Sequence, residues 1–204
     1  MDENFVIHYK EPSADSETTF LLLHGTGGNE RDLIPLAQHL NPAAACICPR
    51  GQVSEGGALR YFRRFAEGVL DLDDWRARSL ALAAFVNRQC LERKRDPEQL
   101  FAMGYSNGAN SAQGLLLLAP QTVAGAVLIR PMFVTQPEPM LPLVGKRILL
   151  LCGRHDPLMQ PNDPERLLQQ YRERGADVRL ELLEAGHQLT RDDMQRMDEW
   201  FNSL

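Results

Sequence analysis

The 204-residue sequence lacks any apolar run approaching the roughly 20 residues needed to span a bilayer. Its opening stretch, MDENFVIHYKEPSADSE, starts with acidic side chains and has no apolar signal-peptide core. The sequence also lacks an excess of positive charge, since it has 22 Lys and Arg and 27 Asp and Glu, and the mildly acidic net charge of −5 argues against a nucleic-acid surface. We therefore expect a soluble, cytoplasmic protein that binds no nucleic acid and does not insert stably into membranes.

Cysteine is rare, and its spacing offers no metal site. The sequence has only 4 cysteines, and none belongs to a C-x-x-C pair or has a histidine at zinc-ligand spacing. We expect buried free thiols, which suit a reducing cytoplasm. Histidines and carboxylates do not cluster, and the GTGG stretch at 25–28 lacks the lysine of a P-loop. The sequence therefore predicts neither a metal nor another cofactor.

Short apolar runs alternate with helical patterns along the whole chain. Several runs are apolar at every position, as in parallel strands that are covered on both faces. The length and the hydrophobic fraction of 44% suit one domain, residues 1–204. The strand-like runs lie at 5–9, 20–24, 44–48, 100–105, 124–129, 147–153 and 178–185, and the helical patterns at 31–40, 73–95, 107–118, 163–175 and 190–203. We expect an α/β fold with a mostly parallel central sheet and helices on both faces, in which the first two runs pair antiparallel.

The stretch GYSNG at 104–108 matches G-x-S-x-G, the nucleophile elbow. A serine in this setting lies on a sharp turn between a strand and a helix, and here an apolar run precedes Ser106 and a helical pattern follows it. Gly104 and Gly108 leave room for a strained main chain and close packing. Taken alone, the pattern also fits a glycine-rich turn without any catalytic role.

Two further residues follow later strand-like runs in the order that the elbow requires. A serine hydroxyl is a weak nucleophile and needs a base that is oriented by a third group. Asp156 follows the run 147–153, and His187 follows the run 178–185. Taken singly, Asp156 also fits an aspartate in a turn or a helix cap, and His187 also fits a histidine on a surface loop. Because parallel strands end at one edge of the sheet, we expect Ser106, Asp156 and His187 to form a catalytic triad, with His155 as a bystander on a different loop.

The stretch LLLHGTGGNE at 21–30 ends an apolar run abruptly in glycines. Attack on an ester carbonyl creates an oxyanion, which needs backbone N–H donors held in place. We expect these donors to be the N–H groups of Asn107, directly after the nucleophile, and Thr26. The neighbouring glycines let the backbone turn its amides toward the substrate. A simple glycine-rich turn is the alternative.

Six stretches in this order resemble the carboxylesterase/phospholipase family of small α/β-hydrolases, which includes acyl-protein thioesterases. They are LLLHGTGGNE, PRG (49–51), FRRFAEG (62–68), MGYSNGAN, LCGRHDPLMQP and AGHQLT. The resemblance implies an esterase without a separate cap domain, with the triad and oxyanion residues named above. Acyl-protein thioesterases usually read G-F-S-Q-G and H-G-L-G-D, whereas GYSNGAN is more similar to bacterial esterases of the type associated with hydroquinone resistance.

The stretch 49–75 is long for a connection, and long ordered loops are often functional. We expect it to fold over Ser106 as a lid, with a loop packed only for stability as the alternative. The predicted substrate-pocket residues are Tyr61, Phe62, Phe65, Met132, Phe133, Leu158 and Met159. Arginines of the same stretch are candidates to meet an anionic leaving group, or else form a solvated, salt-bridged face.

The resulting hypothesis is a serine esterase or thioesterase that acts on small to medium acyl substrates through an acyl-enzyme, with a small-molecule ester or thioester as substrate. One alternative is a lysophospholipase, although a net charge of −5 gives no help at anionic membranes. Another is an α/β-hydrolase-fold protein that binds a ligand without catalysis. An exposed apolar lid is compatible with a homodimer.

Overall fold

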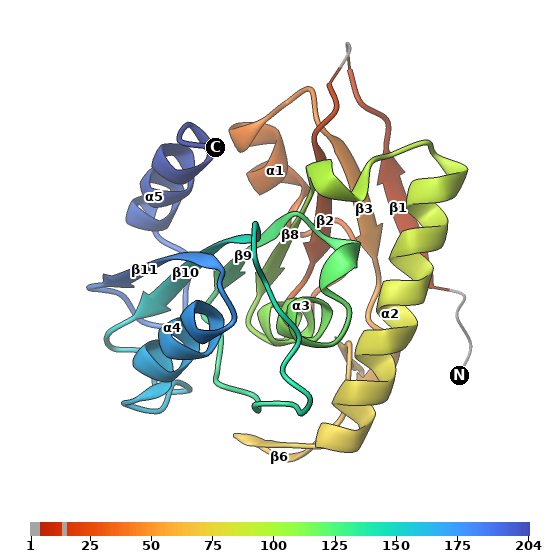
Figure 1. Ribbon diagram of the computed structural model, residues 1–204. Helices are drawn as coiled ribbons and strands as arrows, with labels where there is room; N and C mark the ends of the chain where they lie inside the picture. Colours follow the sequence, from red (N-terminus) through yellow and green to blue (C-terminus); the bar gives the residue numbers. More distant parts are fainter. Residues whose placement is uncertain (1–4, 14–15) are drawn as a thin grey trace.

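Strands in the order β1-β3-β2-β8-β9-β10-β11 form a central seven-stranded sheet in the computed structural model, which describes residues 5–13 and 16–204 (Figure 1). The strands are β1 (Ile7–Lys10), β2 (Thr19–Leu23), β3 (Ala45–Pro49), β8 (Leu100–Tyr105), β9 (Gly125–Ile129), β10 (Arg147–Gly153) and β11 (Asp177–Leu183). Neighbouring strands run parallel apart from the β1–β3 pair. Strands β2, β3 and β9 are buried at every residue, which explains their uninterrupted apolar sequences. The predicted fold class is confirmed.

The prediction that the first two strands pair with each other was wrong. Strand β1 pairs antiparallel with β3, with Ile7 opposite Pro49, and β3 lies between β1 and β2. Strand β2 is fully buried and takes parallel partners on both sides, whereas β1 is only half-buried along its length and suits an edge. Turn-forming residues between two strands therefore indicate a reversal of direction, but burial decides which strands become neighbours.

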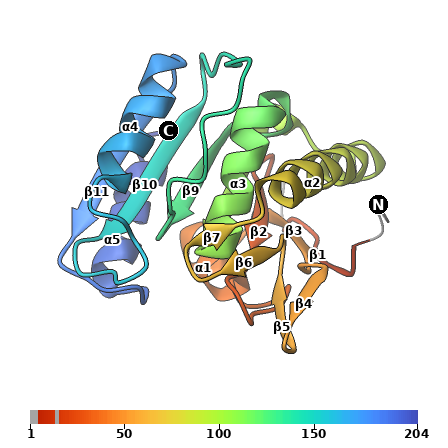
Figure 2. The ribbon, with the colours of Figure 1, turned by 90° about the horizontal axis from the view of Figure 1, so that it is seen from below.

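Helices cover both faces of the sheet. Helices α2 (Leu72–Glu92), α3 (Asn107–Leu118) and α4 (Asp163–Glu173) lie on one face, and α1 (Ile34–Leu40) and α5 (Arg191–Phe201) on the other (Figure 2). Side chains of β2 alternate between the two cores, since Leu21 packs with the first group of helices and Phe20 with the second. Within the described residues, no helix combines the length and apolar content needed to cross a membrane.

The segment 49–75 folds into two small hairpins. Strand β4 (Val53–Glu55) pairs with β5 (Ala58–Arg60), and β6 (Arg64–Ala66) pairs with β7 (Val69–Leu70). Figure 2 shows the β6–β7 hairpin close to the start of α2, and residues of both hairpins line one cavity with the N-terminal end of α3. Gly27 donates its N–H to the Leu59 carbonyl oxygen at 2.9 Å. The hairpins are thus joined to the loop that follows β2.

All four cysteines are buried and free, as predicted. Burial raises the pKa of each thiol, to about 11 for Cys90 and to about 12 for Cys152. These thiols therefore stay protonated and pack as small apolar groups.

Candidate active site

Ser106 occupies a strained turn between β8 and α3. Its φ of 54° lies in the left-handed region, which a non-glycine residue adopts at a cost. The strand and the helix meet closely here, because a Cβ on Gly104 would collide with the backbone of Gly108, and a Cβ on Gly108 would collide with that of Leu23. The Ser106 N–H donates to the Ile129 carbonyl oxygen at 2.9 Å. The two glycines therefore allow the turn that places Ser106 at the carboxyl edge of the sheet.

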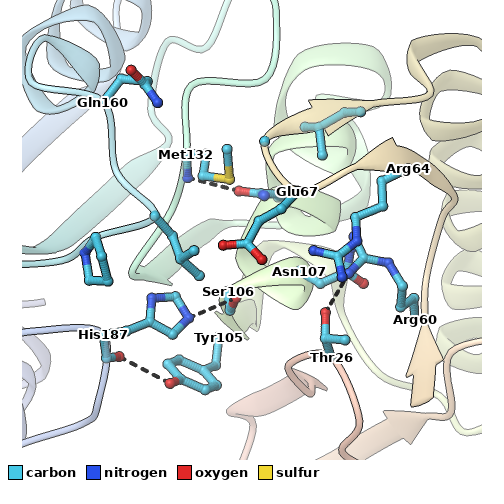
Figure 3. A pocket seen from close by; sticks show the side chains of 15 residues that line it. Thr26, Arg60, Arg64, Glu67, Tyr105, Ser106, Asn107, Met132, Gln160 and His187 are labelled. Carbon is cyan, nitrogen blue, oxygen red and sulfur yellow. Dashed lines mark hydrogen bonds between the residues drawn. The ribbon is translucent and has the colours of Figure 1, made fainter. Parts of the chain in front are cut away.

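The structure brings Ser106, His187 and Asp156 together. His187 Nε2 lies 3.0 Å from Ser106 Oγ (Figure 3), and His187 Nδ1 lies 2.8 Å from Asp156 Oδ2. Asp156 is buried, and its Oδ1 accepts a hydrogen bond from the Leu158 N–H at 2.9 Å, so the carboxylate is held in orientation. A carboxylate only accepts, so Nδ1 carries the proton and Nε2 is left to accept the serine proton. This arrangement can turn the hydroxyl into a nucleophile.

Two other histidines, His155 and His39, pair with surface carboxylates. His155 Nε2 pairs with Glu184 at 2.9 Å, and both side chains are largely exposed. His39 pairs with Asp198 at 3.0 Å, also at the surface. Neither lines the cavity beside Ser106, which agrees with the interpretation of His155 as a bystander.

Thr26 and Asn107 line one cavity together with Ser106. Across residues 5–13 and 16–204, the backbone N–H groups of Thr26 and Asn107 donate to no protein acceptor. Asn107 is the first residue of α3, where the helix end is electropositive. Gly27 has a φ of 80°, so the turn after Thr26 requires a glycine. Both predicted oxyanion residues therefore border the same cavity and have free donors.

His24 fastens the loop after β2 to the start of the hairpin segment. Its Nδ1 donates to the Gly25 carbonyl oxygen at 2.7 Å, and its Nε2 accepts from the Gly51 N–H at 3.0 Å. The Tyr61 hydroxyl accepts from the His24 N–H at 3.2 Å and donates to the Pro49 carbonyl oxygen at 2.8 Å. Burial lowers the pKa of His24, so the ring stays neutral. Sequence reasoning placed His24 only at a strand end and missed these contacts.

The cavity has a volume of about 490 Å³, and Ser106 lies among the side chains that line it (Figure 3). Of the predicted pocket residues, Met132 and Leu158 line it. Its other lining residues are Thr26, Arg60, Arg64, Glu67, Gly68, Leu70, Tyr105, Ser106, Asn107, Asn110, Pro157, Gln160 and His187. The hairpins of segment 49–75 therefore supply one wall, and the loops after β9 and β10 supply the other.

The other predicted pocket residues lie elsewhere. Tyr61 and Phe62 are buried in the core, where the Tyr61 hydroxyl donates to the Pro49 carbonyl oxygen. Phe65 is 76% exposed, since side chains alternate along β6 and its neighbour Arg64 takes the cavity side. Phe133 and Met159 pack against the core. The prediction was wrong for these five, because apolar character does not tell which face of a short strand or loop a side chain occupies.

Two of the arginines that the sequence offered as candidates for an anionic leaving group, Arg60 and Arg64, line the cavity, whereas Asn110 was missed. Arg60 is buried and donates to Thr26 Oγ1 at 2.7 Å, and it shares Glu55 with Arg64. Asn110 Oδ1 accepts from the Met132 N–H at 3.0 Å, which leaves its amide hydrogens for a bound molecule. Asn110 comes three residues after Asn107, so helical spacing was a usable signal. The arginines of 49–75 were predicted only as a group, because nothing in the sequence distinguishes Arg60 and Arg64, which line the cavity, from Arg63, which does not.

In the part of the chain that the structure describes, no three His, Cys, Asp or Glu side chains gather in a way that could hold a metal ion.

Residues 70–200 match the model of the dienelactone hydrolase family, and this span includes Ser106, Asp156 and His187. The chain belongs to the dienelactone hydrolase family. Among its relatives is MhqD of Bacillus subtilis (strain 168), a protein named only as a hydrolase, which is 35% identical over 91% of this chain and 93% of its own.

Two solved structures resemble this member of the dienelactone hydrolase family over nearly its full length. The Bacillus cereus carboxylesterase has a TM-score of 0.94 at 36% identity and covers 98% of this chain and 94% of its own. A carboxylesterase from Mesorhizobium loti has a TM-score of 0.88 at 30% identity and covers 93% of this chain and 90% of its own. The resemblance drawn from the motifs is confirmed, and the protein is a hydrolase of the carboxylesterase type.

Proposed function

We propose that the protein is a serine hydrolase that cleaves carboxylic esters or thioesters of small to medium acyl groups through an acyl-enzyme. The observation that carries this proposal is the continuous chain of contacts from Ser106 Oγ through His187 to Asp156, at 3.0 Å and 2.8 Å, on the wall of an open cavity. The carboxylesterases from Bacillus cereus and Mesorhizobium loti support an ester as the substrate.

The first half of the reaction forms the acyl-enzyme. Ser106 Oγ attacks the carbonyl carbon while its proton passes to His187 Nε2, and Asp156 stabilises the resulting imidazolium. The carbonyl oxygen becomes an oxyanion that accepts hydrogen bonds from the N–H groups of Thr26 and Asn107. When the tetrahedral intermediate collapses, the bond to the leaving group breaks and His187 gives its proton to the departing alcohol or thiol.

The second half of the reaction releases the acid. A water molecule gives a proton to His187 Nε2 and attacks the acyl carbon, which again produces an oxyanion at the same donors. Collapse of this intermediate breaks the bond to Ser106 Oγ, and the proton returns from His187 to the serine. The carboxylic acid leaves, and the free enzyme is restored.

The cavity favours small or medium acyl groups. Its volume of about 490 Å³ lies in the usual range for small-molecule sites, roughly 300–1,000 Å³. Apolar side chains such as Leu70 and Met132 share the wall with Arg60, Glu67 and other polar groups. This mixed lining supports a short acyl chain over the long one of a lysophospholipase, and a complete triad supports catalysis over binding alone.

Hydrolysis of p-nitrophenyl acetate, butyrate and palmitate, with a thioester matched to the butyrate, tests the proposal. We expect turnover of the short esters, and its loss in Ser106→Ala. Ser111→Ala is the matched control, because Ser111 lies on the same helix and donates to the Asn107 carbonyl oxygen at 3.1 Å. A fluorophosphonate probe should label wild type and Ser111→Ala but not Ser106→Ala. Turnover of palmitate alone would favour a lipid substrate, and neither turnover nor labelling would favour a binding protein.

A further inference from the structure

Three consecutive backbone carbonyls around His187 accept hydrogen bonds from side chains at the ends of neighbouring strands. Arg130 Nε donates to the Gly186 carbonyl oxygen at 2.8 Å, and Arg130 Nη2 donates to that of Gln188 at 2.9 Å. Between them, the Tyr105 hydroxyl donates to the His187 carbonyl oxygen at 3.0 Å, as Figure 3 shows. The main chain on both sides of the imidazole is therefore held, although it belongs to a loop.

Arg130 is fully engaged. It directly follows β9 with a φ of 53°, and its side chain is completely buried. Besides the two carbonyls, Nη1 donates to the Leu151 carbonyl oxygen at 3.1 Å and to Asp193 Oδ1 at 2.7 Å, and Nη2 donates to Asp193 Oδ2 at 2.7 Å. A guanidinium has five N–H donors, and each of them has a partner here.

Asp193 connects this arginine to the start of α5. Its side chain is completely buried, and Oδ2 also accepts from the Thr190 N–H and from Thr190 Oγ1, both at 2.8 Å. Thr190 and Asp193 form the capping box that begins the helix. Arg130 thus joins the ends of β9 and β10, the first turn of α5 and the loop that carries His187 into one rigid unit.

Tyr105 holds the same loop from the side of the nucleophile. It immediately precedes Ser106, and its ring packs on the imidazole of His187 with ring centres 5.3 Å apart. On the other side it packs against Gly25, where an added Cβ would lie 2.8 Å from the ring. Burial raises the pKa of Tyr105, so its hydroxyl remains a donor to the loop.

We propose that Arg130 and Tyr105 are positioning residues that act through the backbone of residues 186–188 to keep His187 aligned with Ser106. This inference rests on the proposed function, because it concerns the base of that reaction. Fixing the carbonyls on both sides fixes the direction in which the imidazole leaves the main chain. A misplacement of about 1 Å in such a group can cost about a hundredfold in rate, so these buried contacts bear on kcat rather than on substrate binding.

Tyr105→Phe tests the hydroxyl alone, since the ring and its packing are retained. We expect kcat for p-nitrophenyl butyrate to fall about tenfold with KM within threefold of wild type. The matched control is Tyr171→Phe, because Tyr171 is buried and its hydroxyl has no partner among the described residues. Tyr171→Phe should leave both constants unchanged.

Arg130 requires a paired substitution, because removing it alone leaves the buried Asp193 without a counter-charge. We therefore use Arg130→Met/Asp193→Leu, which removes both charges, and expect a folded protein whose kcat is at least about a hundredfold lower. Arg174→Met is the control. Arg174 is also buried and donates to two carbonyl oxygens, of Leu141 and Pro137, each at 3.3 Å, and no hydrogen bond in the described part of the chain joins it to the loop of His187. The Arg174→Met substitution should lower the free energy of unfolding without changing kcat.

A measurement independent of turnover separates this inference from the proposed function. The ¹⁵N NMR signals of the His187 imidazole report which nitrogen carries the proton, and wild type should show the Nδ1–H form. In Tyr105→Phe and in Arg130→Met/Asp193→Leu we expect the imidazole to exchange between the Nδ1–H and the Nε2–H tautomers. Folded variants with wild-type kcat, or with unchanged imidazole signals, would overturn the positioning role. A wild type without turnover whose imidazole signals still respond to the variants would refute the proposed function and leave the positioning role supported.

Discussion

Gly108 packs so closely against Leu23 that even a methyl group on the glycine would collide with the leucine carbonyl oxygen. This contact brings the first turn of α3 onto the end of β2, and so brings the nucleophile turn next to the loop of Thr26. We expect Gly108→Ala to destabilise the fold by about 1–3 kcal/mol and to lower ester hydrolysis more than tenfold, because the turn has to move. Urea unfolding and p-nitrophenyl butyrate turnover measure the two effects.

The control is Gly56→Ala at the tip of the β4–β5 hairpin. Gly56 has a φ of 58° and open space around it, so alanine there meets only the left-handed backbone cost of about 1–2 kcal/mol. Its turnover should match wild type. Wild-type turnover in Gly108→Ala would contradict the role given to the close packing.

The side chain and the backbone of Asn107 have separate tasks. Its Oδ1 accepts from the Tyr61 N–H at 2.8 Å, whereas the backbone N–H of Asn107 itself has no acceptor among the described residues. Asn107→Ala leaves the buried N–H of Tyr61 without an acceptor. We therefore expect a stability loss of about 1–3 kcal/mol, while most of the activity remains. Asn107→Asp should recover the stability, because it retains the acceptor, but its charge should lower kcat by opposing the oxyanion. A loss above about a thousandfold in Asn107→Ala would mean that the side chain takes part in catalysis.

Stability should fall in mild acid because of His24. Burial lowers its pKa below the usual value of 6.5, so below that pH the unfolded chain binds a proton that the folded chain does not. The stabilisation from the neutral ring is therefore complete above pH 6.5 and is lost as the pH falls toward the lowered pKa. Urea unfolding from pH 7.5 to 5 should show a stability gap between wild type and His24→Asn that narrows with acid. A constant gap would refute this assignment.

The substrate wall can be tested by comparing two apolar residues. Leu158 lines the cavity, whereas Phe65 is 76% exposed. Leu158→Ser should lower kcat/KM for the butyrate ester about fivefold, because apolar surface that meets the acyl chain is lost. Phe65→Ser should leave kcat/KM within twofold of wild type. If Phe65→Ser lowered kcat/KM more than Leu158→Ser, Phe65 would have to contact the substrate, and the β6–β7 hairpin would have to turn inward when substrate binds.

The seven strands of the central sheet, the five α-helices and the convergence of Ser106, Asp156 and His187 were all predicted from the sequence, because each prediction depends on short-range information. Buried parallel strands are apolar at every position, and the elbow needs glycines at fixed distances from Ser106. Asp156 and His187 could be selected because parallel strands all end at one edge, so position after a strand predicts position in space.

The sequence-based predictions were wrong where the outcome depends on which segments pack next to one another in three dimensions. The partner of β1, the solvent-facing side of Phe65 and the burial of Tyr61 and Phe62 depend on what packs alongside, and residue type does not report this. Arg130 shows this most clearly, because its donors reach Gly186, Gln188 and Asp193, more than fifty residues further along the chain.

The amino-acid sequence by itself determined the order of the elements, the tight turn around Ser106 and the chemical identity of the groups that follow each strand. Only the tertiary structure decided which of these groups face one another, which of them are exposed to solvent and which side chains contact the loop that carries His187. The physical reason is range: turn geometry and burial patterns act between residues close in the chain, whereas the cavity wall and the contacts of Arg130 exist only after distant segments have packed together.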